Sequence, residues 1–109
     1  MLSLLFGSGL REKILLYLTE CGEGYGSELA KNFKASLFAV QNQMQRLEEA
    51  GILVSRTEGK TRLYSMNPRY FLRTELVALL KKNFKALPES EIRTYYRPRR
   101  RLRRAGKPL

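Results

Sequence analysis

The most regular hydrophobic pattern in the chain lies between Ser36 and Gly51. Apolar residues recur there at spacings of three, four and three, at Leu37, Val40, Met44 and Leu47. At about 100° per residue, these positions share one narrow stripe of an α-helix. Ser36 is suited to cap the helix N-terminus, and Gly51 to end the helix in the left-handed conformation. The pattern therefore predicts one helix between these two residues.

The opposite face of this helix is mostly polar. Its side chains are Ser36 at the start, then Phe38, Gln41, Asn42, Gln45 and Arg46, with Glu49 near the end. Gln and Asn can pair with adenine edges, and Arg with guanine, when a helix enters the major groove of DNA. An ordinary amphipathic helix with a solvated face has the same pattern. The helix alone therefore does not decide whether it binds DNA.

Two shorter helices are predicted before it. The first runs from Leu10 to about Glu20 and buries Leu10, Ile14, Leu15 and Leu18. The second begins with Ser27 as its N-cap and turns Leu29, Ala30 and Phe33 inward. Between them the glycine-rich CGEGYGS indicates a loop, from which Tyr25 could enter a short strand. A short helix, a brief turn and a longer polar-faced helix form a helix-turn-helix arrangement.

After Gly51 the hydrophobic period changes from 3.6 to 2. The segments ILVSR and TRLYSM are strand candidates, and the four-residue connection TEGK between them suits a hairpin. The longer, polar-faced helix of a helix-turn-helix is called the recognition helix. A hairpin that follows it is the wing of a winged helix. Its cations lie at or near the hairpin tip, and we expect them to contact DNA phosphates: Arg56, Lys60 and Arg62. The alternative is solubilising charge on an edge strand.

A longer helix is predicted from Asn67-Pro68 to Pro88, because Asn suits the N-cap and Pro the first helical position. Its broad apolar stripe consists of Phe71, Leu72, Leu76, Leu79, Leu80 and Phe84. We expect this stripe, together with the apolar segment 1–9, to form a homodimer interface, since a small domain often gains stability by dimerising. The alternative is that the helix packs only on its own core.

The net charge of +11 comes from 21 Lys and Arg against 10 Glu. Eight cations and no acid lie between Arg93 and Lys107, so residues 1–92 contribute only +3. Such a balance favours a polyanionic partner. We expect a winged-helix domain over 1–87 and a basic tail over 88–109 that is disordered when unbound. The tail would contact phosphate through Arg97, Arg99, Arg100, Arg101, Arg103 and Arg104. A solubilising end is the alternative, and Tyr95 and Tyr96 could instead dock on the domain.

The composition excludes several kinds of chemistry. The chain has no His and a single Cys, Cys21, so His-based catalysis, an internal disulfide and a four-ligand zinc site cannot be assembled. We therefore expect a protein that is not an enzyme and needs no cofactor. No apolar stretch approaches the ~20 residues that span a bilayer. The N-terminus lacks the basic lead of a signal peptide. These features favour a cytoplasmic location.

The run VQNQMQRLEEAGILVSRTEGKTRLYSMNP resembles the recognition-helix-to-wing segment of ArsR-like winged-helix transcriptional regulators. The resemblance lies in RLEEAGIL, EGK at the turn, a Tyr in the return strand and NP at the exit. It implies a fold that is mainly α with a small β-hairpin, and a repressor that binds double-stranded DNA as a homodimer. Ser36, Gln41, Asn42 and Gln45 match positions at which such proteins touch DNA, and Arg56, Lys60 and Arg62 match the wing.

Two departures from that family matter. Metal-sensing members carry paired thiolates, which this chain lacks, so we do not expect metal sensing. Family members often have a His where this chain has Gln43, so a DNA contact at this position is left open. The segment LFGSGLREKILLYL is also similar to small winged-helix proteins found beside, or fused to, nucleotidyltransferase domains. The alternative function is therefore a protein- or RNA-interaction module, for example an adaptor or antitoxin partner of a nucleotidyltransferase. Phe38 would suit a protein contact.

Overall fold

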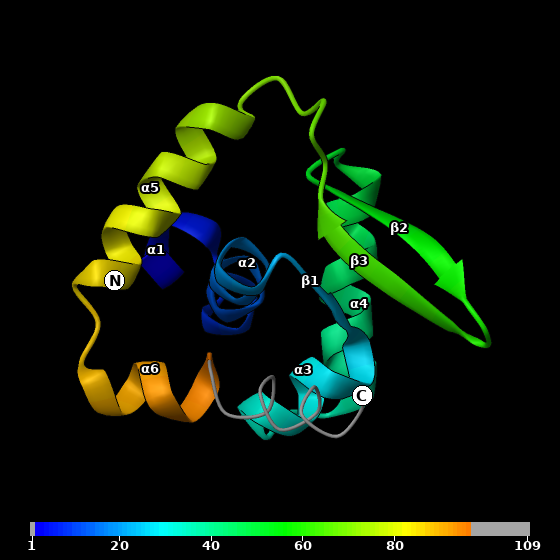
Figure 1. Ribbon diagram of the computed structural model, residues 1–109, viewed down its shortest axis with the longest axis horizontal. Helices are drawn as coiled ribbons and strands as arrows, with labels where there is room; N and C mark the ends of the chain where they lie inside the picture. The colour runs from blue at the N-terminus through cyan, green and yellow to red at the C-terminus, as the bar shows by residue number, and fades with distance from the viewer. Residues whose placement is uncertain (1, 97–109) are drawn as a thin grey trace, which may run out of the picture.

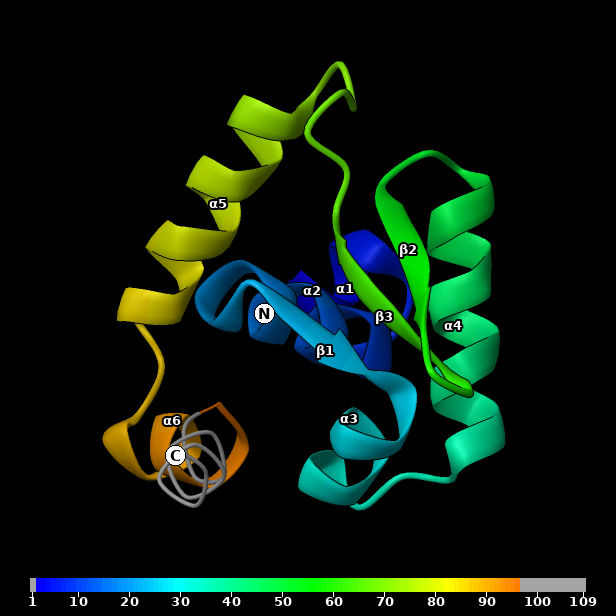
Figure 2. The same cartoon turned by 45° about the vertical axis from the view of Figure 1, so that its right-hand side comes forward.

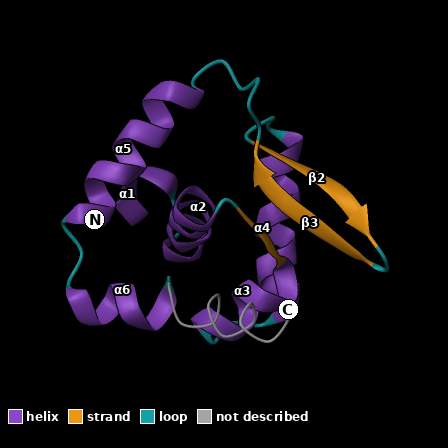
Figure 3. Ribbon diagram, in the orientation of Figure 1, coloured by secondary structure: helices purple, strands orange, loops and turns teal. Residues whose placement is uncertain are grey.

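The computed structural model describes residues 2–96, apart from the side chain of Ser3. In chain order the elements are α1 (Leu2–Phe6), α2 (Gly9–Cys21), β1 (Glu23–Tyr25), α3 (Gly26–Phe33), α4 (Leu37–Glu49), β2 (Leu53–Glu58), β3 (Thr61–Met66), α5 (Arg73–Lys85) and α6 (Glu89–Tyr95) (Figure 1). The predicted fold class, mainly α with a small hairpin, is confirmed. The hairpin belongs to a three-stranded antiparallel sheet with strand order β1-β3-β2, and Figure 3 shows the hairpin on the side of the molecule away from α5.

Helix α2 forms the centre of the core. Residues 14–18 are all at most 1% exposed, so this helix is covered on every side in its middle turns. Helix α4 and the sheet lie on one side of α2 and α5 lies on the other, in both views (Figures 1 and 2). The predicted stripe was too narrow, because it left out Leu16 and Tyr17, which are also buried. Ser8 caps α2, its Oγ accepting a hydrogen bond from the Arg11 amide at 3.1 Å.

Helix α4 begins and ends as its sequence predicts. The Ser36 Oγ accepts a hydrogen bond from the Ala39 amide at 3.0 Å, and Gly51 follows the helix with a φ of 86°. The Ile52 amide donates to the Leu47 carbonyl at 3.0 Å, which satisfies an end group that the helix itself leaves free. Val40, Met44 and Leu47 are buried, whereas Leu37 is 45% exposed and does not belong to the core stripe.

Two local predictions around the sheet are wrong. The hairpin turn has two residues, Gly59 and Lys60, because Glu58 pairs directly with Thr61. Gly59 takes a φ of 63°, which suits glycine and permits the tighter turn. Helix α3 begins at Gly26, so Ser27 is not its N-cap. The expected strand at Tyr25 is confirmed, since β1 pairs with β3.

Helix α5 begins at Arg73, five residues later than Pro68, the predicted first helical position. Asn67 is not an N-cap. Its Nδ2 donates to the Gly51 carbonyl at 2.8 Å, and its Oδ1 accepts from the Arg69 amide at 2.9 Å. Asn67 therefore stabilises a turn and ties the exit of the hairpin to the end of α4.

The packed domain continues beyond Pro88, so the predicted start of the disordered tail is wrong for residues 89–96. Helix α6 buries Ile92, and Tyr96 is only 2% exposed. The Tyr96 ring lies 5.5 Å from the Phe84 ring and 6.2 Å from the Phe33 ring. The alternative expectation, that the two tyrosines dock on the domain, describes this end of the chain better. The six tail arginines from Arg97 to Arg104 lie outside the described residues.

Candidate nucleic-acid interface

The outward face of α4 is an exposed row of amides with one guanidinium. Gln41, Asn42, Gln45 and Arg46 are all exposed. They extend over more than one turn of a helix that is held on its other side by Val40, Met44 and Leu47. A rigid helix therefore presents hydrogen-bonding groups of the kind that read base edges. The Ser36 hydroxyl is already used to cap the helix.

A groove separates α4 from the hairpin and brings part of the predicted site together. It has a volume of about 660 Å³, and Gln41, Gln45 and Glu48 form its helical wall. Lys60, Thr61, Arg62 and Tyr64 form the opposite wall, and residues 25–27 lie at one end. Asn42 and Arg46 do not line this groove, because they lie about 100° farther round the helix than Gln41 and Gln45. The amides therefore share one surface with Lys60 and Arg62, in two adjoining strips.

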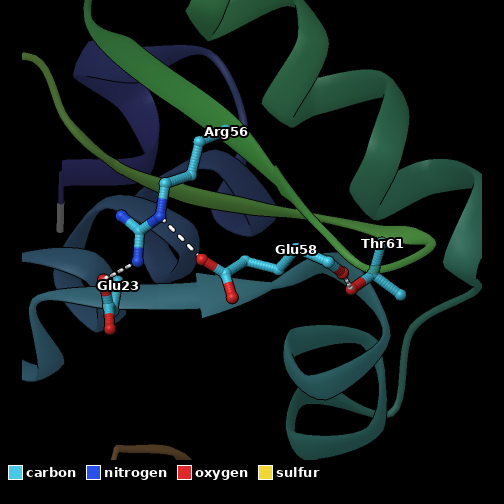
Figure 4. A network of polar contacts seen from close by, with 4 residues as sticks. All are labelled: Glu23, Arg56, Glu58 and Thr61. Carbon is cyan, nitrogen blue, oxygen red and sulfur yellow. Dashed lines mark hydrogen bonds and ion pairs between the residues drawn. The ribbon is translucent and has the colours of Figure 1, made fainter.

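The three wing cations do not act as one cluster. Arg56 pairs across the hairpin with Leu63, and Arg62 pairs with Thr57, so the two arginines lie on opposite faces of the sheet. The Arg56 Nε donates to Glu58 at 2.8 Å, and the Arg56 Nη2 lies 3.7 Å from Glu23 (Figure 4). The hydrogen bond to Glu58 raises the pKa of Arg56. Arg56 is thus engaged by two carboxylates away from the groove, while Lys60 and Arg62 line it.

A polar link in the wall of the groove was not predicted from the sequence. The Ser55 Oγ donates to the Glu48 Oε2 at 2.7 Å and accepts from the Arg62 Nη1 at 2.9 Å. Tyr64 lies opposite Ser55 in the sheet register, and burial, with the nearby Glu48 carboxylate, raises the pKa of its phenol. Period-two alternation along the two strands was the signal that could have placed Ser55 and Arg62 on the helix-facing side.

Gln43 has a structural role in this chain. Its Oε1 accepts a hydrogen bond from the Arg11 Nε at 2.8 Å, and the same guanidinium donates to the Phe6 carbonyl at 2.6 Å. Arg11 therefore ties α4 to the N-terminal end of α2 and to α1. Gln43 is half-buried and oriented by this contact.

The six residues predicted for a dimer interface separate into two groups. Leu80 and Phe84 are buried by the chain itself, at 0% and 8% exposed, and Leu76 packs partly against the same core. Phe71, Leu72 and Leu79 are 84%, 42% and 39% exposed. Leu4 and Leu5 of α1 are also exposed, at 93% and 66%. Apolar surface is therefore left over, but only part of the predicted stripe contributes to it.

Residues 2–96 contain no group of three or more Cys, Asp, Glu or His side chains placed to hold a metal ion. Over the same residues, the helices are too short or too polar to span a bilayer.

Comparison with known proteins finds likeness in structure only. No protein-family model matches the sequence, and no curated protein matches it significantly. The YusO protein from Bacillus subtilis superposes with a TM-score of 0.57 and 22% identity, over 78% of this chain and 66% of YusO. ZitR from Lactococcus lactis, a zinc-responsive MarR family member, gives a TM-score of 0.51 and 16% identity, over 77% of this chain and 65% of ZitR. A variant of ZitR in complex with DNA matches with a TM-score of 0.51 and 17% identity, over 77% of this chain and 64% of that one.

At these identities the likeness defines the class of fold: the chain is a winged helix-turn-helix protein. The chain spans about two thirds, or slightly less, of the length of the proteins it matches. ZitR is named as a MarR family member, whereas the sequence resemblance was to ArsR-like regulators. The ArsR-like assignment therefore stays a prediction from the sequence.

Proposed function

We propose that this chain is a DNA-binding transcription regulator, in which α4 enters the major groove and the hairpin contacts the backbone. The observation that carries the proposal is the joining of exposed amides on α4 with Lys60 and Arg62 along one groove. A helix with hydrogen-bonding groups can read base edges, and cations beside it can hold the phosphates. The complex of a ZitR variant with DNA supports this use of the fold.

In this arrangement the α4 residues have distinct roles. Asn42 and Gln45 lie at mid-helix and contact base edges, with Gln41 beside them. Arg46, one turn beyond Asn42, contacts a guanine or a phosphate. Lys60 and Arg62 contact the backbone or a minor groove and position the protein more than they specify sequence. Arg56 contributes less than the sequence suggests, because Glu23 and Glu58 already engage it.

The regulator acts as a homodimer in this proposal. Its contact uses the apolar side chains that the chain leaves exposed, Leu4, Leu5, Phe71, Leu72 and Leu79. Two recognition helices would then lie about 34–36 Å apart, one turn of DNA. Light scattering at micromolar concentration should give the mass of two chains, and a strict monomer with and without DNA would remove the dimer from the proposal. Repression is the expected outcome, because a bound dimer covers DNA. Metal sensing is not part of it, since the chain has one Cys and no His.

The decisive experiment is selection of bound duplexes from random DNA with the purified full chain. A regulator should enrich one sequence with two half-sites about one helical turn apart. The matched control is a chain in which Asn42 and Gln45 are both replaced by Ala, which should bind DNA without enriching that sequence. Equal enrichment by both proteins would show that α4 does not read DNA.

One observation favours a second function, a module that binds protein. Phe38 is 79% exposed and follows Leu37, which is 45% exposed, so the first turn of α4 has an apolar tip. On DNA, Phe38 would contact a thymine methyl group. Replacing Phe38 with Ala separates the two functions, because it should change the preference for thymine at one position only if this tip reaches the bases.

A further inference from the structure

Three side chains from three elements form one chain of hydrogen bonds beside the groove. Glu48 lies in the last turn of α4, Ser55 on β2 and Arg62 on β3. The Ser55 Oγ is 2.7 Å from the Glu48 Oε2 and 2.9 Å from the Arg62 Nη1. The link therefore connects the recognition helix to the returning strand of the wing.

The chemistry of the three groups fixes the direction of both hydrogen bonds. An ionised carboxylate only accepts and a guanidinium only donates, whereas a hydroxyl has one hydrogen to donate and lone pairs that accept. Ser55 must therefore donate to Glu48 and accept from Arg62. Alanine could do neither, and a side chain with only donors could not complete the chain. The hydroxyl is the one group of the three that makes both contacts.

The position of Glu48 shows why its carboxylate needs a hydrogen-bond partner. A carboxylate in the last turn of a helix meets the negative end of the helix dipole, which is unfavourable. It also lines a groove whose opposite wall carries Lys60 and Arg62, where DNA phosphates would repel it. The Ser55 hydroxyl satisfies this carboxylate, and the Arg62 charge at the end of the link partly offsets it.

Most N–H donors of the Arg62 guanidinium are not used by the contact with Ser55. A guanidinium has five N–H groups, and the contact with Ser55 uses Nη1. The Arg62 side chain is exposed, so its remaining N–H groups are open to solvent on the hairpin surface. A long side chain loses rotamer freedom when it binds, and a contact that fixes it beforehand reduces that cost.

From this arrangement we infer that Ser55 is a positioning residue for DNA binding, which holds the Arg62 guanidinium ready for the DNA backbone and couples it to α4. The inference rests on the proposed function and names a further residue in it. Ser55 itself need not touch DNA. Its effect on affinity must therefore pass through Arg62, and that dependence can be measured.

The test is a double-mutant cycle in the full chain, using the duplex obtained by selection. Titrations compare the wild type, Ser55→Ala, Arg62→Ala and the double variant. Ser55→Ala should weaken binding about three- to tenfold, the effect of one or two hydrogen bonds, and should leave the ranking of sequences unchanged. With Arg62 already replaced by Ala, the same change should have less than about a twofold effect. Equal losses in both backgrounds would overturn the inference.

Two further variants separate positioning from structure. Ser55→Thr keeps the hydroxyl and should restore most of the affinity. Ser65→Ala removes a hydroxyl from the opposite face of the same sheet and should leave binding unchanged. If Ser65→Ala weakens binding as much as Ser55→Ala, the effect belongs to the stability of the hairpin and the inference fails. If the wild type prefers no duplex at all, the proposed function itself fails, a result distinct from an additive cycle.

Discussion

Helices α4 and α5 have the same length, 13 residues each, but expose opposite chemistry. The outer face of α4 carries amides, with one Arg against two Glu over the helix, whereas α5 carries four cations against one Glu and leaves Leu79 exposed. Charge alone would select α5 as the DNA-binding helix. Placement favours α4 for the proposed role, because α4 and not α5 shares a groove with Lys60 and Arg62.

The difference separates two contributions to DNA binding. Base edges are recognised by directed hydrogen bonds, for which neutral amides on a rigid helix are suited. Affinity for the backbone comes from cations, which need no rigid element. Helix α4 has the first property without the second. In the proposed complex the backbone contacts should therefore come mainly from the wing and from the basic C-terminal segment, with Arg46 as the one cation of α4.

The comparison predicts first that, within one chain, α5 packs on the core with one side and leaves its other side uncovered. Leu80→Ala should lower the free energy of unfolding by about 2–5 kcal/mol, because Leu80 is fully buried and its truncation leaves a cavity. The neighbouring Leu79→Ala, at a position 39% exposed in the single chain, should cost less than about 1 kcal/mol when the protein is dilute enough to be monomeric. Denaturant unfolding followed by circular dichroism measures both. Equal losses would mean that Leu79 is covered in solution, as in a dimer.

The second prediction concerns the cations of the C-terminal segment. Because Tyr96 is packed in the domain, the chain should be shortened after Tyr96 and not at Pro88. Removing residues 97–109 takes away seven cations. If half of them contact phosphate, the slope of log affinity against log salt should fall by about 3, at about 0.9 per phosphate. The ranking of DNA sequences should stay the same.

Binding isotherms over a salt series, with full-length and shortened chains on two duplexes, test both statements. An unchanged slope would remove this segment from the account of DNA binding. A changed ranking would mean that recognition is shared between the C-terminal segment and α4.

The third prediction addresses the amides of α4 directly. Replacing Asn42 or Gln45 with Ala should cost about 1–3 kcal/mol on the preferred site and relax the preference at one base position. Non-specific binding should barely change, because neither residue carries charge. Lys82→Ala on the outer face of α5 is the matched control and should leave the base preference intact. Full specificity in both α4 variants would show that the recognition face is wrongly assigned.

The local pattern of the sequence was enough to predict α4, the hairpin and the helix-turn-helix order. Each depends on residues close in sequence, such as the Ser36 cap, the Gly51 end and the alternation along β2 and β3. Contacts between distant segments were not predictable in this way. Asn67 has the residue type of an N-cap, but its side-chain Nδ2 donates a hydrogen bond to the Gly51 carbonyl, 16 residues earlier.

The same limit applies to α6 and to the candidate site. The helix stop at Pro88 and the basic composition beyond it placed the end of the domain there, because neither could show that Phe33 and Phe84 form a site for Tyr96. The count of wing cations likewise treated Arg56 and Arg62 alike. Their separation follows from the strand register and from Glu23 on a third strand, which depends on how distant residues pair.

The prediction with the smallest expected effect compares one tyrosine on each side of the core, Tyr96 and Tyr64. The Tyr96 hydroxyl, on the α5 side, is buried without a hydrogen-bond partner among the described residues. Tyr96→Phe should therefore leave stability at pH 7 unchanged or raise it by up to about 1 kcal/mol, because the variant no longer buries an unsatisfied group. Tyr64, on the α4 side, lines the polar groove and offers the comparison.

The direction of the pKa shift of Tyr96 determines how stability should change with pH. Burial, with smaller contributions from Glu91 and Glu12, raises the pKa of Tyr96 in the folded chain above its ordinary value. As the pH rises past about 10, the unfolded chain releases the phenolic proton while the folded chain keeps it, so stability falls. Tyr96→Phe should flatten this alkaline loss, and Tyr64→Phe should flatten it less, since Tyr64 is less deeply buried and Arg62 opposes the shift in its pKa. Thermal unfolding between pH 8 and about 11 measures both variants against the wild type. An identical alkaline loss in the wild type and in Tyr96→Phe would mean that the hydroxyl meets water, and that α6 opens from the α5 side of the core before the rest of the domain unfolds.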